Sequence, residues 1–222
     1  MDSAQIFSKI DHTILAPTAN WQEVDIVCQD AIKHKTASVC IPPSYVKRAF
    51  DAYGKDLNIC TVIGFPLGYS TTEVKKFETE QAIKEGASEI DVVINIGDVK
   101  NKSYDKITDE LSQLKKITGD KILKVIVEVC YLSPEEKKAI CKCVTDSGAD
   151  FIKTSTGFGT GGATIEDINI FKANIGVGVQ IKASGGIRTK EDFVSYINLG
   201  CTRIGTSSAV KVLVDNTDGG AY

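Results

Sequence analysis

The sequence predicts an α/β fold, a single (β/α)8 TIM barrel with parallel strands. Eight short apolar segments, rich in Val and Ile, recur along the 222 residues, and helical patterns separate them. Most of these segments are continuous rather than alternating, which is typical of parallel strands covered on both faces. Alternating strands and helices within one chain of this length favour a barrel. The alternative is an open doubly wound sheet, which rarely uses eight strands in so short a chain.

Each predicted strand is a short run of apolar residues that polar or glycine-containing segments bound on both sides. Cysteine, threonine or lysine interrupts several of these runs, yet the apolar character continues on either side. The strands are expected at residues 12–15, 38–41, 60–64, 90–95, 123–129, 151–155, 179–184 and 203–207.

Several of the intervening helices carry recognisable start and stop signals. A Ser or Thr followed three residues later by an acidic residue predicts a capping box, and Pro favours the first helical position. A glycine after a helical pattern fits the left-handed residue that ends many helices. The predicted starts are Ser70 with Glu73, Ser133 with Glu136 and Pro134, Thr164 with Asp167, and Thr189 with Asp192; the predicted ends are Gly86, Gly148 and Gly200.

Composition narrows the class of protein. The chain is 42% hydrophobic and 25% charged, and no linker or low-complexity tract divides it, so we expect one domain over residues 1–222 with a flexible tail from about 216. A net charge of −3 gives no attraction to nucleic acid or anionic membranes, and no apolar run is long enough to span a bilayer. The polar N-terminus lacks the features of a signal peptide.

Cysteine usage predicts a reducing compartment. The seven cysteines are odd in number and form no CxxC motif, and only two histidines accompany them. We therefore expect free thiols, a cytoplasmic location and no metal site.

A weak internal repeat places particular side chains inside the barrel. Segments 86–91, 148–153 and 200–205 each begin with a helix-ending glycine and continue into a strand. Their last residues are Asp91, Lys153 and Gly205, and segment 35–40 puts Cys40 in the same position. Alternate strands of such a barrel contribute one interior layer. The repeat therefore predicts that an acid and a base face each other, with a glycine leaving room beside them.

Three interpretations of Lys153 compete. Lysine is rarely buried unless it has a charged partner or takes part in chemistry. Lys153 is a surface lysine at a strand end, an ion-pair partner of Asp91, or a nucleophilic amine that forms a Schiff base. The interior layer weakens the first reading. Lys182, in the next predicted strand, weakens the second, since one carboxylate then balances two ammonium groups.

Two neighbouring ammonium groups favour a reactive amine. At about 5 Å and an effective dielectric constant near 20, their repulsion is roughly 3 kcal/mol, which lowers a pKa by about 2 units. Burial lowers a lysine pKa further. We therefore expect Lys153 to be the nucleophile, Lys182 the cation that perturbs it, and Asp91 the proton-transfer group.

The predicted carboxyl ends of the last three strands suit a phosphate group. The segments STGFGTGGAT, SGGIR and GTSSAV follow them, and loops at this position of a barrel often bind phosphate through backbone N–H groups. Gly185 and Gly186 permit close backbone approach, and Ser207 and Ser208 supply donors. Arg188 either adds charge or is an exposed strand-end arginine.

At these residues the chain resembles the deoxyribose-phosphate aldolases, a family of class I aldolases. The resemblance covers nearly the whole length. Its motifs are IDHTIL, VIGFPLG, EIDVVINIG, KVIVEV, ADFIKTSTGF, KASGGIR and RIGTSSAV, and the combination of FIKTSTG with KASGGIR is highly specific.

The resemblance implies reversible cleavage of 2-deoxy-D-ribose 5-phosphate to acetaldehyde and D-glyceraldehyde 3-phosphate, with no cofactor and no metal. It gives Lys153 the Schiff base and Lys182 and Asp91 the other catalytic roles. Some members carry a lysine where this chain has Phe158, so phosphate binding here relies more on backbone donors. The implied substrate-binding residues are Asp11, Thr13, Cys40, Thr156, Gly157, Gly185, Gly186, Gly205, Ser207 and Ser208.

Other possibilities stay open at this point. Tyr222 either assists proton transfer from a mobile tail or belongs to a frayed terminus. An isomerase or epimerase on the same scaffold explains the phosphate loops but leaves the lysine pair idle, and a non-catalytic barrel predicts sugar-phosphate binding without turnover. The expected partners are a sugar phosphate and aldehydes, and we expect a homodimer or higher homo-oligomer.

Overall fold

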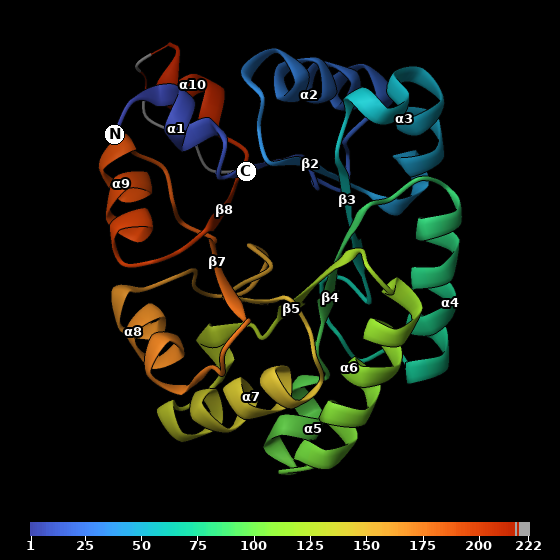
Figure 1. The fold of residues 1–222 in the computed structure, drawn as a ribbon, viewed down its shortest axis with the longest axis vertical. Helices are drawn as coiled ribbons and strands as arrows, with labels where there is room; N and C mark the ends of the chain where they lie inside the picture. The colour runs from blue at the N-terminus through green and yellow to red at the C-terminus, as the bar shows by residue number, and fades with distance from the viewer. Residues whose placement is uncertain (216, 218–222) are drawn as a thin grey trace.

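Eight parallel strands close into a barrel in chain order in a computed structural model of the protein, which describes residues 1–215 and 217 (Figure 1). β1 pairs with both β2 and β8, so the predicted barrel is confirmed and an open sheet is excluded. The predicted extent of the domain and its tail stays a prediction, and Tyr222 lies outside the described residues. The strands are β1 Ile10–Thr13, β2 Ser38–Ile41, β3 Ile59–Ile63, β4 Glu89–Val93, β5 Ile122–Ile126, β6 Phe151–Lys153, β7 Gln180–Ser184 and β8 Arg203–Thr206.

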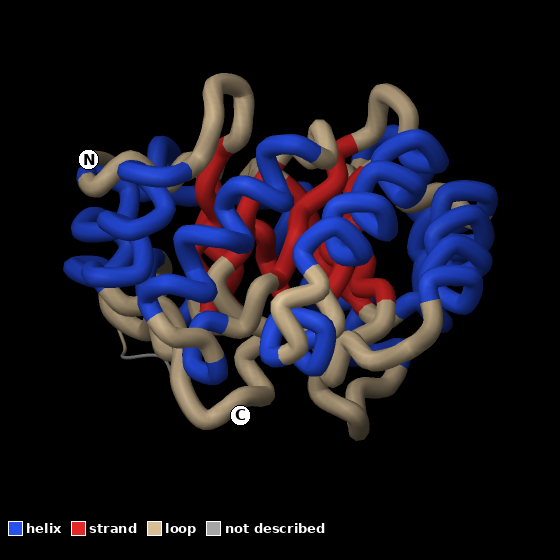
Figure 2. The backbone as a smooth tube through the Cα atoms, turned by 90° about the horizontal axis from the view of Figure 1, so that it is seen from below, coloured by secondary structure: helices blue, strands red, loops and turns tan. Residues whose placement is uncertain are grey.

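Helices surround the strands on the outside, and the strands lie within this layer when the barrel is turned by 90° (Figure 2). None of the helices in the described part of the chain is both long and apolar enough to cross a membrane. The helices are α1 Ser3–Phe7, α2 Trp21–His34, α3 Val46–Tyr53, α4 Thr72–Lys84, α5 Ile96–Lys100, α6 Tyr104–Thr118, α7 Pro134–Asp146, α8 Ile165–Asn174, α9 Lys190–Asn198 and α10 Ala209–Leu213.

Most of the predicted helix signals are confirmed. Ser133, Thr164 and Thr189 each accept a backbone hydrogen bond in a capping box. The prediction for Ser70 was wrong: α4 is capped at Thr71, whose side chain makes no capping hydrogen bond. Glu73 is then only the second helical residue, one position too early for a capping box.

The three predicted helix-ending glycines follow α4, α7 and α9 with positive φ. Their φ angles are +114°, +76° and +108° at Gly86, Gly148 and Gly200. A side chain with a β-carbon is disfavoured in this region, so glycine suits all three turns.

Of the eight predicted strands only β2 has the predicted bounds, and six end earlier than predicted; β1 and β5 show why. β1 ends at Thr13, and Leu15 instead packs beside Cys40 at the barrel mouth. β5 ends at Ile126, because the chain turns at Glu128 into a left-handed conformation with φ +52°. Both differences occur at the carboxyl ends of strands, where the chain leaves the sheet to form the rim.

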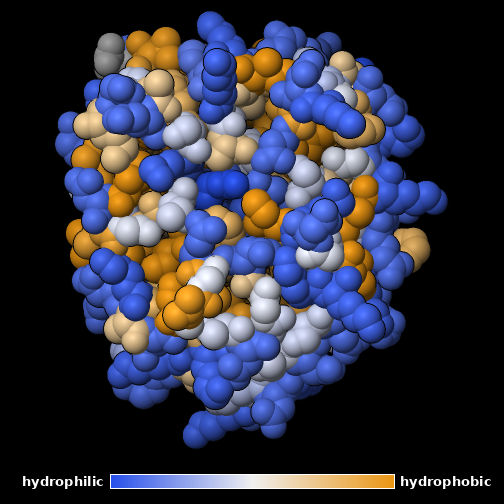
Figure 3. Space-filling model, in the orientation of Figure 1, coloured by the Kyte–Doolittle hydropathy of each residue, from blue (hydrophilic) through white to orange (hydrophobic). Residues whose placement is uncertain are grey.

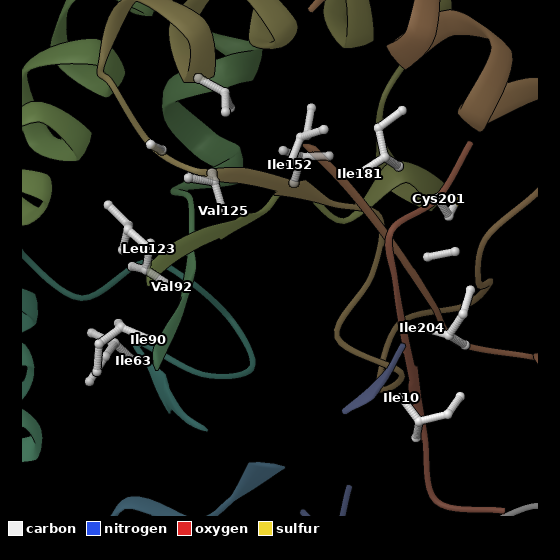
Figure 4. Close-up of a cluster of buried hydrophobic side chains, with 14 of the residues drawn as sticks. Ile10, Ile63, Ile90, Val92, Leu123, Val125, Ile152, Ile181, Cys201 and Ile204 are labelled. Carbon is white, nitrogen blue, oxygen red and sulfur yellow. The ribbon is translucent and has the colours of Figure 1, made fainter. Parts of the chain in front are cut away.

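The strands alternate between an apolar outer face and an interior that is largely charged, with a small apolar cluster of Cys40, Cys60 and Val62. The outward residues pack beneath the helices (Figure 4). In β4, for example, Ile90 and Val92 belong to this outer core, and Glu89 and Asp91 point into the barrel, where they contact charged groups. The labelled outer residues are Ile10, Ile63, Ile90, Val92, Leu123, Val125, Ile152, Ile181, Cys201 and Ile204.

Candidate active site

A cluster of seven charged side chains occupies the barrel interior. Six are buried, and the seventh, Arg203, has a side chain that is only 13% exposed. Because successive side chains of a strand point to opposite faces, residues two apart on one strand both reach the interior. The cluster consists of Asp11, Glu89, Asp91, Lys124, Lys153, Lys182 and Arg203.

Asp91 lies at the centre of the cluster and binds three ammonium groups. Lys153 and Lys182 donate to its Oδ2 at 2.8 and 2.7 Å. Lys124 donates to its Oδ1 at 2.9 Å. The predicted meeting of Asp91 with Lys153 is confirmed. Lys153 and Lys182 share one carboxylate oxygen and are therefore close neighbours.

The remaining contacts correct the expected charge balance. Lys182 also binds Asp11 at 2.5 Å, and Lys124 binds Glu89 at 2.5 Å. Arg203 connects the two carboxylates, at 2.5 Å from Asp11 and 2.8 Å from Glu89. The expectation that one carboxylate balances two ammonium groups was therefore wrong, because three carboxylates share the buried cations.

Lys124, Glu89 and Arg203 were missed as members of the site. Lys124 lies in a predicted buried strand, so the signal that singled out Lys153 and Lys182 applied to it as well. Glu89 is two residues before Asp91, and this spacing places both on one face of a strand.

The cluster holds most of its members in their charged forms. Burial raises the pKa of Asp91, but Lys124, Lys153 and Lys182 outweigh this effect and keep the pKa well below its usual value. The same opposition, with Lys182 as the main attraction, lowers the pKa of Asp11. Burial lowers the pKa of Lys182, but the attraction of Asp11 and Asp91 raises it by a larger amount. The pKa is therefore above its usual value, and Lys182 stays a cation.

Asp91, Lys153 and Cys40 lie near one another as predicted, and Gly205 lies beside Lys182. A β-carbon on Gly205 would lie 3.0 Å from Cβ of Ser184 and 3.1 Å from Cε of Lys182, so glycine leaves the room that Lys182 occupies. Cys40 is fully buried in the same region, and its pKa is lowered, chiefly by a hydrogen bond with Cys60.

A pocket of about 240 Å³ opens above this cluster at the carboxyl ends of the strands. Lys153 is the only member of the cluster that lines it, since Lys124 and Lys182 are fully buried and Lys153 is 3% exposed. In the middle of the face drawn in Figure 3, hydrophilic residues lie beside hydrophobic ones. The other lining residues are Thr13, Leu15, Thr156, Gly157, Ser184, Gly185, Gly186, Ile187, Arg188, Gly205, Thr206, Ser207 and Ser208.

The pocket brings together most of the residues predicted to bind substrate. Lys182, Asp91, Asp11 and Cys40 instead lie below it, in the buried interior. Arg188, whose position the sequence left open, lines the pocket. The wall therefore combines one amine with backbone and hydroxyl donors from the loops after β6, β7 and β8, which suits a small anionic carbonyl compound.

Two groups of buried residues have the donor atoms that a metal ion needs. They are Cys40, Cys60 and Asp91, and Asp11, Cys60 and Glu89. Their carboxylates already bind lysine or arginine side chains, and a cation entering either group would meet these positive charges. The donor set therefore fits an internal salt-bridge network better than a metal centre.

The fold and the pocket define a (β/α)8-barrel protein with a lysine at the base of an anion-compatible site. A family model described as DeoC/LacD family aldolase matches residues 6–207. The chain belongs to this family of aldolases.

Curated relatives and a solved structure agree with this family. The chain is 58% identical to a deoxyribose-phosphate aldolase of Clostridium botulinum (strain Alaska E43 / Type E3), over 96% of both chains. It is 54% identical to that of Clostridioides difficile (strain 630), over 96% of this chain and 98% of the relative. The tetrameric deoxyribose phosphate aldolase of Aeropyrum pernix superposes with a TM-score of 0.87 at 31% identity, over 96% of this chain and 91% of that one.

Proposed function

We propose that this protein reversibly cleaves 2-deoxy-D-ribose 5-phosphate to acetaldehyde and D-glyceraldehyde 3-phosphate through a Schiff base on Lys153. One observation carries the proposal: of the three lysines that bind Asp91, only Lys153 borders the pocket. The names of the curated relatives support the substrate. The proposed place of the reaction is the breakdown of deoxyribonucleosides.

The first half of the reaction builds an electron acceptor on the enzyme. The unprotonated amine of Lys153 attacks C1 of the open-chain sugar, and the carbinolamine loses water to give a protonated imine. The C3 hydroxyl then gives up its proton and the C2–C3 bond breaks. Its electron pair moves toward the imine nitrogen, which leaves an enamine on Lys153 and releases glyceraldehyde 3-phosphate.

The second half returns the enzyme to its starting state. The enamine takes a proton at C2 to form the imine of acetaldehyde. Water then adds to this imine, the C–N bond breaks, and acetaldehyde leaves with the amine restored. The reaction therefore includes two proton transfers, one from the C3 hydroxyl and one to C2. Both need acid and base groups close by.

Asp91 and Lys182 are the proposed proton-transfer groups. Asp91 receives the C3 hydroxyl proton through a water molecule. Because its pKa lies well below the usual value, Asp91 does not keep this proton and returns it through water to C2 of the enamine. Lys182 remains a cation beside the reacting amine and supports the exchange, since it shares Oδ2 of Asp91 with Lys153.

The phosphate group is proposed to occupy the opposite side of the pocket. Gly185, Gly186, Ser207 and Ser208 line that wall, and Arg188 supplies a positive charge. Phosphate oxygens accept readily from closely approaching backbone N–H groups. Asp11 lies too deep to line the pocket, so its proposed influence on substrate passes through Lys182 and Thr13 at the end of its strand.

The test is chemical trapping of the imine. Acetaldehyde with sodium borohydride should inactivate the enzyme irreversibly and add one ethyl group to the peptide that contains Lys153. Peptide mapping by mass spectrometry locates the label. A label on Lys182 or Lys124 instead, or full activity after treatment, would refute the assignment; sensitivity to chelators without trapping would favour an isomerase or epimerase.

Self-association is a further proposed property. Four large apolar or aromatic side chains are exposed on α4 and the loop before it: Leu67, Tyr69, Val74 and Phe77. Exposed groups of this kind favour protein contacts, and the Aeropyrum pernix relative is a tetramer. Light scattering after size-exclusion chromatography tests the expected homodimer or larger assembly. The cytoplasmic location remains a prediction from cysteine usage.

A further inference from the structure

Glu128 is a buried carboxylate that the proposed mechanism does not use. It follows β5 in a left-handed conformation, with φ +52° and ψ +67°, and is 3% exposed. Such a conformation costs a non-glycine residue roughly 1 kcal/mol or more. Unlike the carboxylates of the interior cluster, Glu128 forms no salt bridge within the described part of the chain, and the charge of Lys153 is the smallest of the influences on its pKa. A buried carboxylate of this kind needs another stabilising partner.

That partner is Thr156, on the loop after β6. The backbone N–H of Thr156 donates to both carboxylate oxygens of Glu128, at 3.2 and 3.3 Å. The Thr156 hydroxyl also donates to Oε2. Burial raises the pKa of Glu128, and these hydrogen bonds from Thr156 oppose the effect only in part.

The loop continues over the carboxylate and shields it from water. A β-carbon on Gly159 would lie 3.1 Å from Cδ of Glu128 and 2.9 Å from Sγ of Cys130, so only glycine passes this close. The N–H of Phe158 donates to Oγ1 of Thr156 at 3.0 Å. The turn of residues 156–159 is thereby tied to the end of β5.

These hydrogen bonds decide whether the Thr156 hydroxyl acts as a donor or as an acceptor toward a ligand. A threonine hydroxyl has one proton and two lone pairs. Its proton is used on Glu128 and one lone pair is used by Phe158, so a single lone pair remains. Thr156 lines the pocket. Its hydroxyl therefore accepts a hydrogen bond from a ligand there and donates none.

We propose that Glu128 is a positioning residue that fixes Thr156 as an acceptor for a hydroxyl group of the substrate. This inference rests on the proposed function, which identifies the ligand as 2-deoxyribose 5-phosphate. The open chain of that sugar carries two hydroxyls, on C3 and C4. The C3 hydroxyl is assigned to Asp91, so the Thr156 hydroxyl accepts a hydrogen bond from the C4 hydroxyl. In the reverse reaction this is the hydroxyl on C2 of glyceraldehyde 3-phosphate.

The substitution Glu128→Gln tests the role with almost no change in shape. Both carboxylate oxygens act as acceptors, so the amide always sets an NH2 group against an N–H or O–H donor of Thr156. The probes are two acceptor aldehydes supplied with acetaldehyde: glyceraldehyde 3-phosphate and 3-phosphopropanal, which lacks the hydroxyl. We expect Glu128→Gln to lower the preference in kcat/KM for the hydroxylated acceptor by about tenfold, as loss of one hydrogen bond to a buried partner predicts.

Asp167→Asn is the control for loss of a buried carboxylate outside the pocket, although Asp167 Oδ1 also binds Lys137 at 2.6 Å. Asp167 Oδ2 accepts from both the backbone N–H and the hydroxyl of Thr164, at 3.2 and 2.7 Å, yet neither residue lines the pocket. This control should lose some thermal stability and keep the wild-type preference. A merely structural role for Glu128 would make the two variants behave alike.

Two results overturn the inference: an unchanged preference in Glu128→Gln, or an unchanged preference in Thr156→Val, which remains informative if the first variant does not fold. Borohydride labelling of Lys153 by acetaldehyde separates this inference from the proposed function. Acetaldehyde has no hydroxyl, so labelling should persist in Glu128→Gln. Absence of labelling and cleavage in the wild-type enzyme would instead refute the proposed function itself.

Discussion

Lys124 and Lys153 project from neighbouring strands into the same cluster, yet their surroundings differ. Lys124 is fully buried and lies 2.5, 2.9 and 3.5 Å from carboxylate oxygens of Glu89, Asp91 and Asp11. Lys153 binds Asp91 and borders the pocket. Burial of a lysine in a strand therefore does not identify the reacting amine. The number of carboxylates around it and its access to the pocket do.

The largest expected effect is the loss of activity on removal of Lys153. Lys153→Ala should lower kcat for cleavage by at least about 10³-fold, because neither of the other lysines that bind Asp91 borders the pocket. Stability should change little, since Asp91 keeps Lys124 and Lys182 as partners. Steady-state kinetics and urea unfolding measure the two effects. Substantial residual turnover would show that Lys153 is not the amine that forms the Schiff base.

Removal of Lys124 should have the opposite profile. Lys124→Met deprives Glu89 and Asp91 of a buried partner, and we expect a loss of about 3 kcal/mol in the free energy of unfolding. Chemical denaturation of this variant beside Lys153→Ala is the measurement. If Lys124→Met is as stable as the wild type and is inactive, Lys124 takes part in the chemistry and the contrast fails.

His12 is also buried, but unlike Lys124 it lacks a hydrogen-bond partner for one of its ring nitrogens among the described residues. It lies on the outer face of β1, 4.0 Å from Asp30, and its Nδ1 has no hydrogen-bond partner among the described residues. Burial lowers the pKa of His12 to about 4, and His34 adds to this effect while Asp30 and a backbone contact with Thr206 oppose it.

A lowered histidine pKa stabilises the fold above the unfolded-state value near 6.5, and this stability is lost as the pH falls toward 4. Between pH 7.5 and pH 5 we expect a loss of about 2 kcal/mol. The lowered pKa values of Asp11 and Asp91 preserve their contribution over the same range, because it is lost only as the pH falls below the usual carboxyl value. Urea unfolding at both pH values should show this loss in the wild type and not in His12→Gln.

The smallest expected effect is at Gly205. In Gly205→Ala the new methyl group meets Ser184 and Cε of Lys182 at 3.0 and 3.1 Å, so Lys182 must move. We expect a loss of about 1 kcal/mol in stability and a severalfold fall in kcat. Calorimetry and kinetics test this. Unchanged kcat would show that the position of Lys182 tolerates displacement, which would weaken its role in proton transfer.

Local signals predicted much of the fold. The capping boxes at Ser133, Thr164 and Thr189 depend on residues three apart, so the sequence alone reveals them. The carboxyl ends of six strands, β1 and β5 among them, were placed too late, because the predicted runs continue past the point where the chain leaves the sheet. The left-handed turn at Glu128 has no signal in residue type, since neither glycine nor asparagine occupies it.

Part of the site was also predicted from local patterns in the sequence. Periodicity placed Asp91, Lys153, Gly205 and Cys40 in one layer, since strand registers repeat along the chain. The network that joins Lys124 to Glu89, Asp11 and Arg203 was not predicted, because it depends on the closure of the barrel that brings β1 and β8 together.

The amino-acid sequence by itself determined the barrel and the presence of lysines and an aspartate in its interior, because strand periodicity decides which face each side chain takes. Only the tertiary structure decided which lysine reaches the pocket and which carboxylates hold the others. Those contacts join strands that are far apart in the chain, and their distances exist only once the sheet has closed.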